Sequence, residues 1–173
     1  MSPTPSRSGA ARPRLSAEDV VDAAVGILQD FGMGDLSMRR VAGVLGVQAS
    51  ALYWHVPDKQ TLLARVADRI AADAVAAVQA RGTTDLPGRM AAAEHALLRH
   101  RDGAEVVTSA LALGLGGLAL HELLLDAAAT PAEGEQALAV LLGSALLRQQ
   151  RTQAAALGLA LGPDVQRHRS APE

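Results

Sequence analysis

Most apolar residues of this chain recur about three or four positions apart, which is the spacing of amphipathic helices. The first such stretch follows Ser16, a good N-cap residue, and continues to Phe31. Gly32 and Gly34 then end it. We find no alternating run of β-branched residues bounded by turn signals, and the pattern therefore predicts an all-α protein.

The rest of the chain predicts two short helices and four longer ones. Ser37 caps the first short helix, Gly46 ends it, and the second runs from about Ala49 to His55. The longer helices are expected over residues 59–81, 86–100, 105–128 and 131–157, with N-caps at Asp58, Asp85 and Thr130 for three of them.

Composition divides the chain into four predicted segments. Residues 1–14 hold three Pro, three Ser and three Arg, which favours a disordered basic arm. Residues 15–60 carry the short helices, residues 61–161 the longer ones, and residues 162–173 form a polar tail. Arg7, Arg12 and Arg14 of the arm are candidates for phosphate or minor-groove contacts, and plain disorder without such contacts is an equally open interpretation.

Bulk composition excludes several classes of protein. The chain has no cysteine, which excludes disulfides and thiolate metal sites and suits a cytoplasmic protein. Its N-terminus lacks the apolar core of a secretory signal. The longest apolar run, Val106 to Leu120, is shorter than the roughly 20 residues of a membrane span, so we expect a buried helix there. The net charge of −2 disfavours a broadly basic nucleic-acid coat but leaves a local DNA-binding surface open.

Residues 36–59, LSMRRVAGVLGVQASALYWHVPDK, have the layout of a helix-turn-helix. Ala42 is small where two helices must cross closely, and Gly46 supplies a residue without Cβ for the turn. The apolar contacts that fix the two helices against each other are expected from Val41, Leu45, Val47 and Leu52. In this arrangement the second helix enters the major groove of DNA and the first crosses the backbone.

Tyr53 and Trp54 are the only tyrosine and the only tryptophan of the chain, and they are adjacent. Neighbours on a helix point in different directions, so at least one of the two rings tends to face solvent. We expect Leu52 and Val56 to face inward, which leaves the phenol hydroxyl and the indole N–H free to donate to phosphate oxygens. The alternative is that the rings pack in the core or in a dimer interface.

These residues carry a resemblance to a known family. Residues 15 to about 71 resemble the DNA-binding domain of the TetR (tetracycline-repressor-like) transcriptional regulators, and LYWHVPDKQTLL at 52–63 is close to the family signature. LLRHRDGAEV at 97–106 also resembles a segment of the family's regulatory domain. The resemblance implies a homodimer, one recognition helix for each half of a palindrome in double-stranded DNA, and a small-molecule effector pocket in the C-terminal helices. The positions where the family touches DNA are Arg39, Gln48, Ala49, Ser50, Ala51, Tyr53, Trp54, His55 and Lys59.

The beginning of the second short helix is made of small residues, Ala49, Ser50 and Ala51. Few side chains there reach base edges, so Arg39 is the best candidate for direct readout, for example of a guanine. Ala49 or Ala51 is suited to contact with a thymine methyl group. The alternative for Arg39 and Arg40 is a solvated pair of charges.

The resemblance also bears on the effector. In tetracycline-binding members, a histidine just after the HRDGA-like segment and another on the long connecting helix help to hold a magnesium–drug complex. The corresponding positions here are Val107 and approximately Val75, and neither side chain ligates a metal. We therefore expect no metal or cofactor and a largely apolar effector, with His100, Val107 and His121 as candidate residues of its pocket.

The predicted last helix is apolar on more than one side over residues 137–147, and residues 113–125 are likewise apolar. Ala139 and Gly143, four positions apart, permit close approach of another helix. We expect a four-helix dimer interface with two such helices from each subunit. The alternative is that these faces close a monomeric core.

Together these features predict a ligand-responsive repressor, not an enzyme, whose effector shifts the dimer toward a spacing of recognition helices that binds DNA poorly. One rival is a small-molecule-binding or enzymatic helical protein with a vestigial helix-turn-helix, which would lack the steep salt dependence of DNA binding. A second rival is a TetR-type activator.

Overall fold

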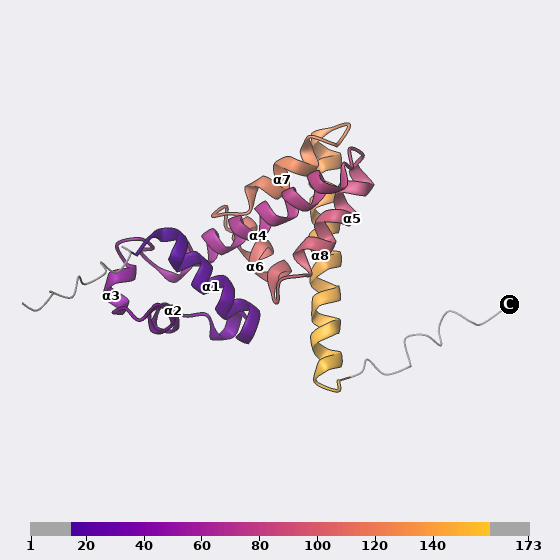
Figure 1. The fold of residues 1–173 in the computed structure, drawn as a ribbon. Helices are drawn as coiled ribbons and strands as arrows, with labels where there is room; N and C mark the ends of the chain where they lie inside the picture. The colour runs from indigo at the N-terminus through magenta and orange to yellow at the C-terminus, as the bar shows by residue number, and fades with distance from the viewer. Residues whose placement is uncertain (1–14, 160–173) are drawn as a thin grey trace, which may run out of the picture.

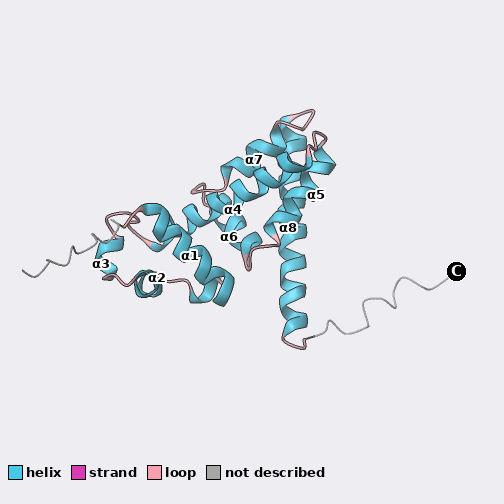
Figure 2. Cartoon of the chain, in the orientation of Figure 1, coloured by secondary structure: helices cyan, strands magenta, loops and turns pink. Residues whose placement is uncertain are grey.

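The computed structural model describes residues 15–159. Within this range the chain forms eight α-helices, one 3-10 helix and no strand, which confirms the predicted all-α class (Figure 2). The predicted basic arm at residues 1–14 and the predicted tail at residues 162–173 lie outside the described residues.

The first four helices are α1 (Ala17–Phe31), η1 (Met33–Asp35), α2 (Met38–Leu45) and α3 (Ala49–Leu52). Two of them, α1 and α2, begin at the predicted caps Ser16 and Ser37. The Ser16 hydroxyl accepts the Asp19 N–H at 3.1 Å and the Asp19 carboxylate accepts the Ser16 N–H at 2.8 Å, a reciprocal capping box. Helix α3 is shorter than predicted, because the N–H groups of His55 and Val56 both donate to the Leu52 carbonyl and close the helix in a turn.

A single long helix, α4 (Lys59–Arg81), joins the two ends of the molecule. Asp58 caps it as predicted, since its carboxylate accepts the Thr61 N–H at 2.7 Å. It contacts α1 as well as later helices between residues 86 and 125. In Figure 1, α1, α2 and α3 gather at one end of α4, and the C-terminal helices gather around its other end. We call α1–α3 with η1 the helix-turn-helix unit.

The C-terminal helices are α5 (Leu86–Leu97), α6 (Gly103–Ala112), α7 (Leu118–Leu125) and α8 (Pro131–Ala156). The prediction of one helix over residues 105–128 is wrong, because Gly114 (φ 66°) and Gly117 (φ 81°) turn the chain between α6 and α7. The prediction that α5 reaches His100 is also wrong. The helix gives way after Leu97 to tight turns, in which the His100 N–H donates to the Leu97 carbonyl at 3.2 Å.

Small side chains bring the C-terminal helices close to α4. Ala67, Ala71 and Ala74 of α4 are fully buried, so neighbouring helices approach its backbone. The loop between α6 and α7 approaches most closely, since a Cβ on Gly116 would lie 2.6 Å from the Ala64 carbonyl oxygen. The Asp68 carboxylate also accepts the Gly117 N–H at 2.7 Å. These contacts fix the beginning of α7 to α4.

No helix within residues 15–159 combines the length and the hydrophobicity needed to cross a membrane. The longest apolar run of the sequence is instead divided between α6, the following loop and the first turn of α7. Its buried part packs into the C-terminal core through Val106, Val107 and Leu120.

Candidate nucleic-acid interface

The turn between α2 and α3 has the left-handed glycine that the sequence predicts. The Ser37 hydroxyl accepts the Arg40 N–H at 3.3 Å and caps α2. Gly46 ends the helix in the left-handed conformation, with φ 65°. The N–H of Val47 then donates to the Ala42 carbonyl at 3.0 Å, which brings the start of α3 back against α2.

Buried apolar residues decide which face of α3 points outward. Val41 of α2 is fully buried, as are Leu52 at the end of α3 and Val56 in the turn that follows. Ala42 is 4 % exposed, in agreement with the close crossing predicted for that position. Because Leu52 and Val56 point into the core, two of the three residues between them are exposed on the surface.

Tyr53 and Trp54 are those exposed residues. Trp54 is 90 % exposed and Tyr53 is 52 % exposed. A tryptophan side chain normally buries most of its large apolar surface, and here it is presented to solvent at the end of a helix. Packing of the two rings in the core of the chain is therefore excluded, and the donors of both rings are accessible.

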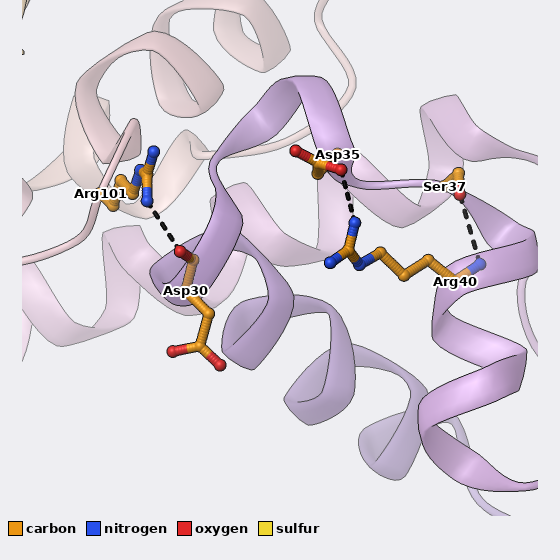
Figure 3. Close-up of polar contacts among 5 residues, drawn as sticks. All are labelled: Asp30, Asp35, Ser37, Arg40 and Arg101. Carbon is orange, nitrogen blue, oxygen red and sulfur yellow. Dashed lines mark hydrogen bonds and ion pairs between the residues drawn. The ribbon is translucent and has the colours of Figure 1, made fainter.

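The two adjacent arginines of α2 differ in what they contact. The Arg40 guanidinium pairs with the Asp35 carboxylate at 2.5 Å (Figure 3). It also lies 3.8 Å from the centroid of the Phe31 ring. Arg39 is exposed and forms no ion pair with any residue between 15 and 159. Arg40 thus stabilises the helix-turn-helix unit, and Arg39 is available to a ligand.

The first turn of α3 presents a mixed surface. Gln48 and Ser50 are exposed, whereas Ala49 and Ala51 are half-buried. The Gln48 side chain does not cap the helix, so its amide remains available to an external partner. The small residues leave room for close approach of another backbone.

His55 and Lys59 lie beyond α3, at the edge of this surface. Lys59 is exposed in the first turn of α4. His55 is half-buried near the N-terminus of α1. The Ser16 hydroxyl is the main cause that lowers the pKa of the Asp19 carboxyl, and the charge of His55 lowers that pKa further.

The three candidate effector residues occupy different environments. The His100 Nε2 lies 3.0 Å from an Asp73 carboxylate oxygen, and the His121 Nε2 lies 2.9 Å from a Glu135 carboxylate oxygen. Val107 is fully buried. In the described part of the chain, no group of three or more His, Asp or Glu side chains is arranged to hold a metal ion.

A contact network that the sequence did not predict joins the helix-turn-helix unit to the C-terminal helices. The Asp102 carboxylate accepts the Met33 N–H of η1 at 2.7 Å, and it also accepts the side-chain amide of Gln153 in α8. Arg101 donates to the Asp30 carbonyl at 2.8 Å (Figure 3). We call residues 98–102 the latch loop.

Asp102 is buried and has φ 56°, a left-handed conformation that is uncommon for residues other than glycine. Gly32 makes the approach of the carboxylate possible, since a Cβ at that position would lie 2.7 Å from an Asp102 oxygen. The Arg-Asp-Gly sequence at 101–103 signalled a break between helices. Its partners lie 51 to 72 positions away and had no local signal.

Comparison with known proteins agrees with this geometry. The family model for "Bacterial regulatory proteins, tetR family" matches residues 20–66. The class D tetracycline repressor of Escherichia coli is 37 % identical over 97 residues, which cover 54 % of this chain and 44 % of that repressor. The chain thus spans a little under half the length of this curated relative.

Solved structures extend the similarity over most of the chain. Mycobacterium smegmatis BioQ aligns with a TM-score of 0.71 and 33 % identity, covering 90 % of this chain and 92 % of that chain. A structure of BioQ with its double-stranded DNA operator aligns with a TM-score of 0.65 and 34 % identity, covering 84 % and 94 % of the two chains.

An exposed helix-turn-helix unit on a bundle of further helices defines a class of helical regulatory proteins. Within that class, the chain belongs to the TetR family of bacterial transcriptional regulators. The resemblance inferred from the sequence is thereby confirmed. Because this is a family of regulators, the prediction that the chain is not an enzyme is confirmed as well.

Proposed function

We propose that the chain is a homodimeric transcriptional repressor that binds a palindromic DNA operator and is released by a small, largely apolar effector. The observation that carries the DNA-binding part is the 90 % exposure of Trp54 beside the half-exposed Tyr53 at the end of α3. The similarity to BioQ, which was solved with its double-stranded operator, supports the same conclusion. Identity to tetracycline repressors supports repression over activation.

The exposed side chains divide into two roles on DNA. Tyr53, Trp54 and Lys59 carry donors that suit phosphate oxygens and would fix the register of the protein on the duplex. Arg39 would read a guanine, and Gln48 offers an amide that suits an adenine edge. Ala49 or Ala51 would contact a thymine methyl group. His55, half-buried at the edge, would contribute a backbone contact through its ring.

A titration of fluorescent duplex DNA tests these assignments. The duplex would carry the inverted repeat found beside the protein's own gene, and binding would be followed by fluorescence anisotropy at several salt concentrations. We expect Arg39→Ala to weaken specific binding by about 1–3 kcal/mol for each half-site, because a bidentate base contact is lost. An affinity that does not fall with salt would contradict DNA binding through phosphate contacts.

Arg81→Ala is the matched control for the charge. Arg81 is also exposed, and it ends the 23-residue helix α4, about 33 Å from Lys59 at the rise of an α-helix. Its removal changes the net charge of the protein by the same amount without touching the helix-turn-helix unit. Equal losses of affinity in Arg39→Ala and Arg81→Ala would refute the contact assigned to Arg39.

The second part of the proposal is the homodimer. Val140 and Leu147 of α8 are 54 % and 58 % exposed, and the small residues Ala139 and Gly143 are exposed beside them. These four residues lie at i, i+1, i+4 and i+8, which places them within an arc of about 100° on one side of the helix. Leu120 and Leu124 of α7 are buried within the chain, so α8 would supply the greater part of the apolar interface. A two-fold dimer places two recognition helices on the two halves of a palindrome.

Gly143 offers a clean test of this interface. A Cβ at Gly143 would meet no atom within 4 Å inside the chain, so a side chain there leaves the monomer unstrained. Gly143→Gln should therefore fold normally and separate the two α8 helices of the dimer. Sedimentation velocity should show a dimer for the unmodified protein and a monomer for Gly143→Gln. A dimer of unchanged affinity in this variant would place the interface elsewhere.

A further inference from the structure

A pocket lies at the junction between the helix-turn-helix unit and the C-terminal helices. Its space not filled by atoms measures about 320 Å³, including the part open to solvent. One wall comes from α4, through Leu63 and Ala64, and the facing wall comes from α6, through Val106 and Ala110. Met33 of η1 closes it on the side of the helix-turn-helix unit. A molecule bound here would touch both parts of the protein at once.

The lining of this junction pocket defines the chemistry that it accepts. Among residues 15–159, the only polar side chains that line it are those of Gln60 and Ser109, and both are exposed at its mouth. No charged side chain from the same described range lines it. A charged ligand would lose its hydration there without gaining an ionic partner, which is costly. The Gln60 amide and the Ser109 hydroxyl can each both donate and accept hydrogen bonds, which suits a neutral polar end on an apolar body.

Exposed leucines at the rim of the pocket indicate that burial of apolar surface would favour the binding of a ligand. Leu113 is 63 % exposed and Leu115 is 48 % exposed, and both belong to the loop between α6 and α7. This loop is fixed to α4 at its far end, where Asp68 accepts the Gly117 N–H at 2.7 Å. Its leucines are therefore held beside the pocket, where an apolar ligand would remove them from water.

Met33 links the pocket to the latch loop. Its side chain lines the pocket while its N–H donates to the Asp102 carboxylate at 2.7 Å. A ligand that displaces the Met33 side chain would weaken this hydrogen bond, which holds η1 against the start of α6. The residues that follow η1 lead directly to Ser37 and α2, so such a displacement would be passed to the DNA-facing helices.

We propose that the junction pocket is the effector site and that it takes a neutral aliphatic molecule with a single hydrogen-bonding end. This inference rests on the proposed function for the consequence of binding, but the binding itself does not depend on it. The site lies apart from His100 and His121, which the sequence suggested for an effector and which pair with carboxylates of neighbouring helices.

Methionine methyl groups provide a direct test with 1-octanol as the probe. The chain has four methionines, of which Met33 lines the junction pocket and Met90 lies on α5, in a groove beside α8. In protein labelled with ¹³C at the methionine methyl groups, 1-octanol should shift the Met33 signal saturably and leave the Met90 signal in place. The signal of Met33 is assigned with Met33→Leu, and octanoate, which is charged, should produce a much smaller shift.

Two variants that block the pocket and one matched control complete the test. Ala110→Leu fills the inner wall, and Ser109→Leu obstructs the exposed mouth without entering the core. Both should abolish the Met33 shift. Ala112→Leu adds the same bulk to an exposed position of α6 that does not line the pocket, and it should preserve the shift. If Ala110→Leu fails to fold, Ser109→Leu alone decides.

Several results would overturn the assignment of the pocket. These are an unmoved Met33 signal up to the solubility limit of 1-octanol, an equal shift of Met33 and Met90, or a Met33 shift that survives in both blocking variants. DNA affinity is measured separately, without 1-octanol. Protein that binds its duplex but shows no Met33 shift would overturn this inference alone. Protein that shows the shift but never binds DNA would overturn the proposed function alone.

Discussion

Replacement of Asp102 by glycine should destabilise the protein by about 2–4 kcal/mol, because the carboxylate accepts two hydrogen bonds that cross between parts of the fold. A hydrogen bond to a charged group contributes about 1.5–3 kcal/mol, so the two bonds together contribute about 3–6 kcal/mol. Glycine offsets part of the loss, since the φ of 56° at this position costs a side-chain-bearing residue about 1–2 kcal/mol and glycine almost nothing.

Asp102→Ala separates the loss of the two hydrogen bonds from the cost of the left-handed backbone conformation. Alanine loses the same acceptor and keeps the unfavourable backbone conformation, so it should be less stable than Asp102→Gly by about 1 kcal/mol. Asp22→Ala is the control, because its carboxylate also pairs across helices, with Arg69 at 2.6 Å, but has a side chain 61 % exposed. An exposed ion pair of this kind contributes about 0–1 kcal/mol.

Urea unfolding followed by circular dichroism measures all three variants against the unmodified protein. We expect Asp22→Ala to be the most stable of the three variants, Asp102→Gly the next and Asp102→Ala the least stable. The slope of the free energy of unfolding against urea concentration should be unchanged in all three. A value for Asp102→Gly within about 0.5 kcal/mol of the unmodified protein would refute the role assigned to the latch loop. If Asp102→Ala were more stable than Asp102→Gly, the left-handed backbone at position 102 would not carry the cost assigned to it.

Two further predictions concern the ends of helices. Gly46→Ala should destabilise the helix-turn-helix unit by about 1–2 kcal/mol, because φ is 65° there, whereas Gly43→Ala in the middle of α2 should stabilise it by about 0.5–1 kcal/mol. A Cβ at Gly43 or Gly46 would meet open space, so urea unfolding of the two variants compares backbone effects alone. Equal changes in stability would contradict the difference in backbone conformation between the two positions. The hydrogen bond from the Thr61 N–H lowers the pKa of the Asp58 carboxyl, so its cap stabilises at neutral pH and is lost as the pH falls through that lowered pKa. The difference in stability between the unmodified protein and Asp58→Ala should therefore be constant near neutral pH and shrink once the pH falls below the usual pKa of an aspartate, about 4. A difference independent of pH would contradict this prediction.

The helix-turn-helix unit was predictable because its signals are local. Ser16, Ser37, Gly46 and Asp58 each act within four residues of their own position, through a cap or a left-handed turn. The apolar positions that orient α3 lie in the same short stretch. Family resemblance and hydrophobic pattern therefore led to the same face of the molecule.

The division between α6 and α7 had a local signal that the apolar pattern obscured. The glycines of the sequence LGLGGL at 113–118 lie within a long run of helix-forming residues, and the prediction of one helix gave the run more weight. In the structure, left-handed turns at Gly114 and Gly117 place the loop against α4. Local preference allows either one continuous helix or two helices, and contact of the loop with α4 favours two.

The latch loop and the junction pocket could not have been predicted in this way. Asp102 meets Met33 across 69 positions of sequence, and the pocket gathers residues from η1, α4, α6 and the following loop. Periodicity gives no information on which helices pack together at such separations. Of the effector residues suggested by the sequence, Val107 came from resemblance to tetracycline-binding relatives, and His100 and His121 were chosen for their polar side chains. The junction pocket is lined by other residues.

The central claim, that the exposed end of α3 contacts DNA, can be tested on the only tryptophan of the chain. At 90 % exposure, Trp54 should be quenched by acrylamide almost as strongly as free indole. Saturation with the operator duplex, confirmed by anisotropy, should protect Trp54 from acrylamide and shift its emission, whereas a duplex of shuffled sequence at the same concentration should protect it much less. Full binding of the operator with Trp54 as accessible to acrylamide as in the free protein would contradict the claim.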